Sequence, residues 1–296
     1  MIMKLGIIGG SGLYQIEGFS ELKTFKIETP FGNPSDEYIT GKLNGAELVF
    51  LPRHGKGHTI LPGELNHKAN ILGMKKLGVT HIISISAVGS LKENLRPKDI
   101  VIPDQYFDRT KKGIEHTFFG NGIVAHIGFG HPVCPKLAAF AKKASDTAIA
   151  SLPEDERPQS VSGGTYVNME GPAFSTKAES LVYRSFGHDI IGMTNLAEAK
   201  LSREAEIAYC TVAMVTDYDC WHPDHEHVTI DMVIANFQSN VKLAKLIVSN
   251  AASMARELEE SPAHSALAGA IITNPQYITK EIKERLAPII GKYAGK

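Results

Sequence analysis

The feature that most constrains the fold of this chain is a series of short apolar runs that stop abruptly at glycine-containing turns. Lys4–Ile8 is followed by GGSG, Glu47–Leu51 by PRHG, and His81–Ser86 by AVGS. Between the last two, Leu65–Leu77 has the apolar spacing of a helix. Alternating strands and helices indicate an α/β protein, and strands that are apolar throughout indicate a sheet buried on both faces.

The second half of the chain continues this alternation. Its patterns predict strands over Val161–Val167, Asp189–Met193 and Ala208–Val215, and helices over Pro135–Ala150, Ser175–Phe186, Leu196–Glu206, Thr229–Glu259 and Lys280–Lys292, with Ser175 or Thr176 as an N-cap. The charged segment Leu152–Pro158 is interpreted as a loop within one domain, because strands continue on both sides of it. We therefore predict a single domain over residues 1–296, with a helical C-terminal segment from about 262 to 296.

Composition argues against several classes of protein. Lys and Arg number 31 and Asp and Glu 32, so the net charge of -1 offers no bulk attraction for nucleic acid or an anionic membrane. The longest stretch without these residues, His116–Pro135, contains four glycines and two prolines, which suits a loop rather than a membrane span. Three cysteines are too few for a disulfide framework, so we expect a soluble, cytoplasmic protein.

Three turns carry groups that suit a phosphate ion. GGSG offers backbone N–H groups and the hydroxyl of Ser11. Arg53 and His54 add a cation and an imidazole donor, and Ser86 with Ala87 adds a hydroxyl and an amide. Each turn alone is equally compatible with an ordinary tight or surface turn. Ligands collect at the carboxyl ends of parallel strands, so together the turns predict a phosphate site; they contain no carboxylate, which argues against Mg²⁺.

Two acidic residues, Asp217 and Asp219, follow the apolar run Ala208–Val215. Acids at the edge of a buried sheet are costly unless a partner hydrogen-bonds to them. Adenine is one such partner, because a carboxyl group can accept from its amino group and donate to a ring nitrogen. A helix cap and a metal-ligand pair are alternatives, the latter with the histidines of HPDHEH (222–227). That run lacks a regular frame of ligands, so we expect no metal.

Six motifs that occur in order together resemble one family. They are GIIGGSGLY, TPFGNPSD, PRHGKGH, SAVGSL, VNMEGPAFST and MVTDYDCW, and the resemblance extends from Lys4 to about Ile247. The chain is similar to the trimer-forming branch of the purine nucleoside phosphorylase family, and within it to the enzymes that cleave S-methyl-5'-thioadenosine. The resemblance implies the nucleoside phosphorylase fold, a single α/β domain whose mixed central β-sheet is flanked by helices.

The resemblance also implies roles for individual residues. For phosphate it implies Ser11, Arg53, His54, Ser86, Ala87 and Thr194; for the nucleoside it implies Phe174 beside the purine, Met193 against the ribose, Ile230 and Val233 near the 5'-methylthio group, and His126 from a neighbouring subunit. Asp217 would serve the imidazole-ring nitrogen of a 6-aminopurine and Asp219 its amino group. One departure is Asn195, where relatives commonly have a small or hydroxyl residue. It leaves the phosphate hydroxyl of Thr194 in place, but the ribose pocket need not have the shape found in relatives.

The implied reaction is phosphate-dependent cleavage of S-methyl-5'-thioadenosine to adenine and 5-methylthioribose 1-phosphate, in purine and methionine salvage. Phosphate is a co-substrate, no cofactor is implied, and the implied assembly is a homotrimer or a dimer of trimers. The alternatives are a phosphorylase of broader specificity (adenosine, or inosine and guanosine) and a nucleoside-binding protein without catalysis. Asp217 argues against a 6-oxopurine substrate, and the joint presence of Arg53, His54 and Thr194 favours an enzyme. A nicotinamide dehydrogenase is disfavoured because Gln15 stands where the third glycine of its fingerprint belongs.

Overall fold

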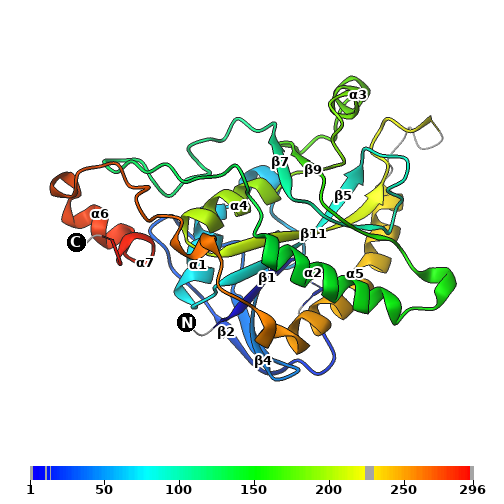
Figure 1. Cartoon of the computed structure of the whole chain (residues 1–296), viewed down its shortest axis with the longest axis horizontal. Helices are drawn as coiled ribbons and strands as arrows, with labels where there is room; N and C mark the ends of the chain where they lie inside the picture. Colours follow the sequence, from blue (N-terminus) through cyan, green and yellow to red (C-terminus); the bar gives the residue numbers. More distant parts are fainter. Residues whose placement is uncertain (1–2, 11, 14, 224–229, 294–296) are drawn as a thin grey trace.

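The chain folds around one large mixed β-sheet with helices on both faces (Figure 1). The computed structural model describes residues 3–10, 12–13, 15–223 and 230–293. Within them the main path of the sheet runs β2-β3-β4-β1-β5-β10-β9-β7, while β11 pairs with β5 and β6, and β6 with β8. The strands are β1 (Leu5–Gly9), β2 (Ser20–Phe25), β3 (Tyr38–Leu43), β4 (Ala46–Pro52), β5 (His81–Ser90), β6 (Ile100–Ile102), β7 (Gln105–Asp108), β8 (Ser160–Ser162), β9 (Thr165–Asn168), β10 (Ile190–Gly192) and β11 (Ala208–Asp217). The expected fold, a single α/β domain with a mixed sheet, is confirmed.

Four neighbouring strands run in the same direction and end at the same edge of the sheet. β1 lies between β4 and β5, and β11 pairs with the other side of β5, all in parallel. β10, in contrast, pairs antiparallel with β5 and places Ile190 opposite Ser90. The chain after β10 therefore runs back along β5 instead of leaving the sheet with the parallel strands.

Helices cover both faces of this sheet. They are α1 (His67–Lys76), α2 (Pro135–Ala150), α3 (Lys177–Ser185), α4 (Asn195–Glu204), α5 (Ile230–Ser253), α6 (Lys280–Arg285) and α7 (Ala287–Ile290), with short 3-10 turns η1 (Pro62–Glu64), η2 (Glu154–Glu156), η4 (Ala255–Glu257), η5 (Pro262–Ser265) and η6 (Pro275–Tyr277). α2 and α5 lie against one face, and α1, α4 and the C-terminal helices against the other, while α3 stands away from the sheet (Figure 1). Among the described helices, none is long and apolar enough to cross a membrane.

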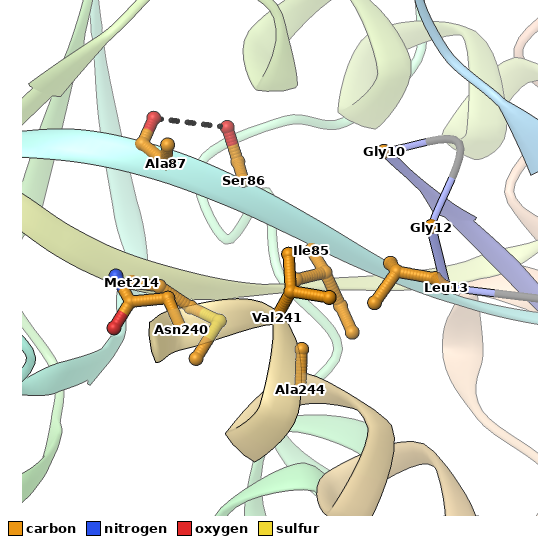
Figure 2. A pocket seen from close by; sticks show the side chains of 10 residues that line it. All are labelled: Gly10, Gly12, Leu13, Ile85, Ser86, Ala87, Met214, Asn240, Val241 and Ala244. Carbon is orange, nitrogen blue, oxygen red and sulfur yellow. Dashed lines mark hydrogen bonds between the residues drawn. The ribbon is translucent and has the colours of Figure 1, made fainter. Parts of the chain in front are cut away.

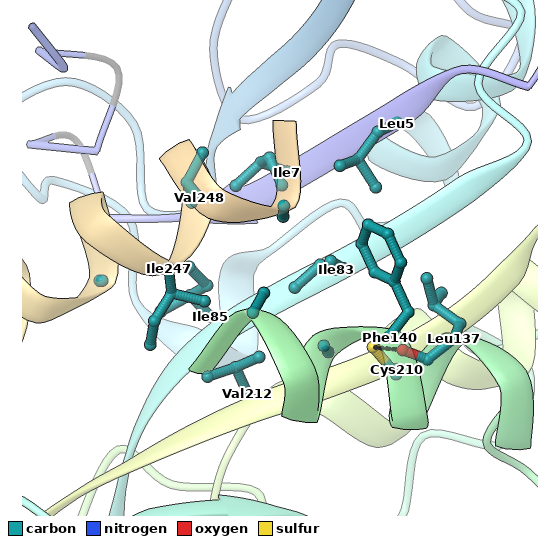
Figure 3. Close-up of a cluster of buried hydrophobic side chains, with 14 of the residues drawn as sticks. Leu5, Ile7, Ile83, Ile85, Leu137, Phe140, Cys210, Val212, Ile247 and Val248 are labelled. Carbon is teal, nitrogen blue, oxygen red and sulfur yellow. Dashed lines mark hydrogen bonds between the residues drawn. The ribbon is translucent and has the colours of Figure 1, made fainter. Parts of the chain in front are cut away.

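Both faces of the central strands are buried, as their continuously apolar sequences predict. In β1, Leu5 and Ile7 point toward α2 and α5 (Figure 3), whereas Ile8 belongs to the cluster on the opposite face. β5 repeats this alternation, with Ile83 in the first cluster and Ile82 in the second. Successive side chains of a strand alternate between faces, so only an uninterrupted apolar run can fill two cores at once.

Several predicted boundaries were wrong, each for a local reason. The predicted strand Val161–Val167 is two strands, because Gly163 and Gly164 both have positive φ and break it. The long helix predicted over Thr229–Glu259 ends at Ser253, and the helix predicted over Lys280–Lys292 divides into α6 and α7, with Pro288 in the first turn of the second. The C-terminal segment is nevertheless helical, and its apolar side chains join the cluster around α1 and α4.

Candidate active site

A pocket opens at the edge where the parallel strands end (Figure 2). It is lined by Gly10, Gly12, Leu13, Ile85, Ser86, Ala87, Met214, Asn240, Val241 and Ala244. These residues come from the turn after β1, from β5 and β11, and from α5, which are far apart in the sequence. Figure 2 shows Ser86 and Ala87 on one side and the apolar Val241 and Ala244 of α5 on the other. The pocket thus combines a polar wall with an apolar one.

The polar wall is part of a strand, contrary to the prediction of a turn. β5 was expected to end at Ser86, but it continues to Ser90. Residues of β11 pair with this extension on one side, from Ala213 opposite Ser86 to Asp217 opposite Gly89, and β10 pairs with its end on the other. Paired backbone groups hold this wall more rigidly than a turn would. Ser11, which was predicted to face it, lies outside the described residues.

Arg53 follows β4 and is held by a residue that the sequence did not single out. Its guanidinium is buried and contacts the carboxylate of Glu198 on α4, with 2.5 Å from Nε to Oε1 and 3.4 Å from Nη2 to Oε2. Burial opposes the charge of Arg53, but Glu198 outweighs it and raises the pKa of Arg53 above its ordinary value. In turn Arg53 outweighs burial and lowers the pKa of Glu198. The predicted cation is therefore one half of a buried ion pair.

Asn195 lies at the centre of a buried polar cluster that supports this pair. Its Nδ2 is 2.9 Å from Ser84 Oγ, 3.0 Å from Tyr209 OH and 2.9 Å from Thr211 Oγ1, and its Oδ1 accepts from Tyr166 OH at 3.0 Å. The side chain is fully buried within the protein. The departure at this position thus affects the interior beneath the site rather than a surface that a ligand could touch.

Thr194 is buried and borders this polar cluster. It is the N-cap residue of α4, and its Oγ1 lies 3.1 Å from Asn195 Oδ1. The hydroxyl of Tyr166 donates to the same Asn195 Oδ1 at 3.0 Å. Asn195 Oδ1 therefore links Thr194, in the segment after β10, to Tyr166 of β9.

His54 is a neutral imidazole whose orientation is set by the backbone. Its Nδ1 lies 2.8 Å from the carbonyl oxygen of Ile60, and its ring stacks on His58 with centroids 4.4 Å apart. Burial, followed by the charge of Arg53, lowers the pKa of His54 to about 4. A carbonyl oxygen only accepts, so Nδ1 carries the proton and Nε2 presents a lone pair. The predicted imidazole donor is thus an acceptor in this state, suited to the hydroxyl of a monoprotonated phosphate.

The two predicted acids lie together at the end of β11. Asp217 accepts from Thr216 Oγ1 at 2.7 Å and from the backbone N–H of Asp219 at 2.8 Å. Asp219 accepts from Ser180 Oγ on α3 at 2.5 Å. Both acids lie against Gly89, where a Cβ would stand 3.0 Å from Asp217 Oδ1 and 3.4 Å from Asp219 Cβ. Glycine therefore lets the end of β5, which also forms the pocket wall, approach the acidic pair.

Both carboxyl groups hold protons more tightly than usual. Burial raises the pKa of Asp217, although hydrogen bonds from Thr216 and Asp219 partly offset it. Burial also raises the pKa of Asp219, to about 6, and the nearby charge of Asp217 adds to the effect. Thr216, Ser180 and the backbone N–H of Asp219 supply hydrogen bonds but no positive charge. The pair is consequently suited to accept from and donate to the polar edge of a ligand.

Three further predicted ligand residues have described positions. Met193 follows β10 and packs on Gly171, where a Cβ would come within 2.5 Å of its sulfur. Phe174 is 56% exposed on the segment that leads to α3. His126 is exposed in the long loop predicted over His116–Pro135. Its backbone N–H donates to the carbonyl oxygen of Ala270 in the C-terminal segment. Within this chain, none of these three lines the pocket of Figure 2.

The two residues predicted to lie near the 5'-methylthio group are Ile230 and Val233, in the first turns of α5. Their side chains lie outside the described part of the structure. The same holds for residues 224–227 of HPDHEH; His222 stacks on Tyr218 with centroids 4.7 Å apart. No group of three metal-ligating side chains occurs among the described residues.

The fold and this edge define a class of protein. The chain belongs to the phosphorylase superfamily, whose family model matches residues 4–253. The S-methyl-5'-thioadenosine phosphorylase of Geobacter sulfurreducens is 55% identical over 289 residues, which cover 98% of each chain. The protein of the same name from Koribacter versatilis is also 55% identical, over all of this chain and 98% of its own.

Solved structures agree with these relatives. A methylthioadenosine phosphorylase sourced from an antarctic soil metagenomic library superimposes with a TM-score of 0.90 at 48% identity and covers 97% of this chain and 98% of its own. The methylthioadenosine phosphorylase of Schistosoma mansoni in complex with adenine has a TM-score of 0.80 at 34% identity, and 98% of each chain is covered. A variant of the Schistosoma enzyme was solved in complex with methylthioadenosine.

Proposed function

We propose that this protein catalyses the phosphate-dependent cleavage of S-methyl-5'-thioadenosine to adenine and 5-methylthio-α-D-ribose 1-phosphate, and is therefore a pentosyltransferase. The observation that carries the proposal is the position of the acidic pair Asp217 and Asp219, which lies against the extension of β5 that also forms the polar wall of the pocket. The proposed purine site and the proposed anion site therefore lie only a few residues apart along β5. Full-length relatives with this activity in their names support the choice of substrate.

At the anion end, phosphate would be held by Ser11, Arg53, His54, Ser86, Ala87 and Thr194. Arg53 supplies a permanent cation, and the neutral His54 accepts from the hydroxyl of a monoprotonated phosphate. No further cofactor takes part in this proposal, since phosphate is itself the attacking group.

At the base end, Asp219 would accept from the exocyclic amino group and Asp217 would protonate the imidazole-ring nitrogen of the leaving adenine. Cleavage of the glycosidic bond builds positive charge on the ribose and negative charge on the base. A phosphate dianion stabilises the first, and a carboxyl group with a raised pKa neutralises the second by donating its proton. Phosphate and base stand on opposite faces of the sugar, so the anomeric carbon is inverted.

The sugar and its 5' substituent would lie between these ends. We assign Met193 to the ribose, Phe174 to the purine, and Ile230 and Val233 to the methylthio group. His126 is exposed and away from the pocket within its own chain, which suits a residue that serves a neighbouring subunit. We therefore also propose a homotrimer, alone or as a dimer of trimers, with each site completed by its neighbour.

The cellular role that we propose is purine and methionine salvage in the cytoplasm. The thiols of Cys134, Cys210 and Cys220 are all free, which suits a reducing compartment. Cys134 and Cys210 are also buried, so the fold does not depend on a disulfide between described residues.

Initial rates with methylthioadenosine, adenosine and inosine, each with and without phosphate, test the proposal. Phosphate-dependent release of adenine, fastest from methylthioadenosine, is the expected result. Faster turnover of inosine would contradict the role assigned to Asp217. Binding of methylthioadenosine without turnover would favour a nucleoside-binding protein instead.

A further inference from the structure

Glu198 has no role in the mechanism proposed above, although it contacts Arg53 directly. It lies in the first turn of α4, is 1% exposed, and has both carboxylate oxygens engaged. Besides Arg53, its Oε2 accepts from Ser84 Oγ at 2.6 Å and from Tyr209 OH at 2.9 Å. Four elements, the end of β4, β5, α4 and β11, thus meet at a single carboxylate.

These contacts determine which part of the guanidinium of Arg53 remains available. Nε and Nη2 of Arg53 donate to Glu198, and Nη2 also donates to Ser84 Oγ at 2.5 Å. Nη1 donates to the carbonyl oxygen of Ile85 at 3.1 Å. Within the described residues, these contacts use every N–H of the group except the second one on Nη1. Because Ile85 directly precedes Ser86 and itself lines the pocket, Nη1 lies beside the polar wall.

We infer that Glu198 is a positioning residue for phosphate: by binding the Nε and Nη2 side of Arg53, it turns the Nη1 side toward Ser86 and Ala87. The inference rests on the proposed function, because it takes Arg53 to be a phosphate ligand. Glu198 also balances the charge of Arg53 while the site is empty, so the guanidinium stays buried in one orientation and does not turn to solvent. A phosphate ion then meets a donor that is already aligned.

A second glutamate on the same helix provides a matched control. Glu204 is 5% exposed and accepts from Thr117 Oγ1 at 2.6 Å and from the backbone N–H of Phe118 at 2.6 Å, with no contact to Arg53. Glu198→Gln and Glu204→Gln therefore make the same substitution at similarly buried positions of α4. Only the first changes what holds Arg53.

The test is to measure KM for phosphate, KM for methylthioadenosine and kcat in the full chain and in three variants. Glu198→Gln should raise KM for phosphate by about 10- to 100-fold, because a misplaced binding group costs up to about 100-fold. Its KM for methylthioadenosine should stay within about two-fold. Glu198→Asp, which keeps the charge, should recover part of the phosphate affinity, and Glu204→Gln should leave both KM values near those of the native chain.

The outcomes separate this inference from the proposed function. If the native chain does not need phosphate, the proposed function is wrong whatever the variants do. If it needs phosphate but Glu198→Gln and Glu204→Gln have the same KM for phosphate, the positioning role is wrong. Should Glu198→Gln fail to fold, Ser84→Ala replaces it, because Ser84 contacts both members of the ion pair. A rise of several-fold in KM for phosphate would support the inference, and an unchanged value would overturn it.

Discussion

The two ends of the candidate site differ in whether their charged groups have an oppositely charged partner. At the anion end, the positive charge of Arg53 is balanced inside the protein by Glu198, and the pair is surrounded by hydrogen bonds from Ser84 and Tyr209. At the base end, Asp217 and Asp219 stand side by side, and their hydrogen-bond partners among the described residues are hydroxyl and N–H donors rather than cations. In a buried ion pair, each charge keeps the other group in place. Two neighbouring buried carboxyl groups instead have raised pKa values, so one of them can carry a proton and donate it.

The difference matches the work proposed for each end. Phosphate brings its own negative charge and needs a cation held in one orientation. A leaving adenine needs a proton, and a carboxyl group holds one near neutral pH only if its pKa is raised. The comparison therefore makes predictions about rate, stability and pH dependence that differ between the two ends.

The largest expected effect is on catalysis at the base end. Asp217→Asn preserves the shape of the side chain but removes the proposed proton donor. Turnover of methylthioadenosine should fall by about 10²–10⁴-fold, which is typical for loss of a positioned general acid. The measurement is kcat with saturating phosphate, and the ratio of inosine to methylthioadenosine rates should rise in the same experiment. Unchanged turnover of methylthioadenosine would rule out Asp217 as the acid.

At the anion end the largest expected effect is on stability. Arg53→Met leaves the buried carboxylate of Glu198 without its cation and should lower the free energy of unfolding by about 3–5 kcal/mol. Urea unfolding followed by circular dichroism measures this loss. The double variant Arg53→Met/Glu198→Gln removes the stranded charge and should regain most of it. If both variants are equally unstable, charge balance is not what stabilises this end.

Of the two ends of the site, the base end should make stability depend on pH. The pKa of Asp219 is about 6 in the folded protein, above its ordinary value of 3.8. The folded state thus binds this proton more tightly than the unfolded chain, and the resulting stabilisation is present below pH ~4 and lost as the pH rises through ~6.

Asp219→Asn removes this titration. The stability of the native chain relative to Asp219→Asn should therefore fall between pH ~4 and pH ~7, measured by urea unfolding at both values. The native chain compared with Glu204→Gln should show a loss in the same direction that is complete only above pH ~7, because burial raises the pKa of Glu204 from 4.5 to about 7. A difference between the native chain and Asp219→Asn that does not vary with pH would contradict the raised pKa of Asp219.

The smallest expected effect concerns the helix that supports the base end. Thr176 caps α3 in a capping box with Glu179, and α3 carries the Ser180 hydroxyl that Asp219 accepts from. Thr176→Ala should cost about 1 kcal/mol of stability. Thermal unfolding would detect it, and Thr176→Ser should restore most of the loss because serine also caps well. Equal stability of the Ala variant and the native chain would show that the capping box contributes little.

Local sequence determined the strands that position the site and most of the residues assigned to it. Continuous apolar runs such as Leu5–Gly9 suit only a sheet buried on both faces, and the polar residues that follow them must then lie at its edge. Asp217 and Asp219 stood out for the same reason, because two acids next to a buried strand need a partner. These inferences depend on residues that are neighbours in the chain.

What the sequence could not reveal depends on contacts between distant segments. Glu198 is 145 positions from Arg53, and on a helix it resembled any charged residue of an amphipathic pattern. Asn195 was likewise recognised only as a departure, although its side chain connects β5, β9 and β11. The direction of β10 and the extension of β5 to Ser90 follow from pairing between strands, which local propensity does not predict. The sequence thus determined which groups reach the edge, and only the tertiary structure decided which charges are balanced there, because burial and pairing are properties of the assembled fold.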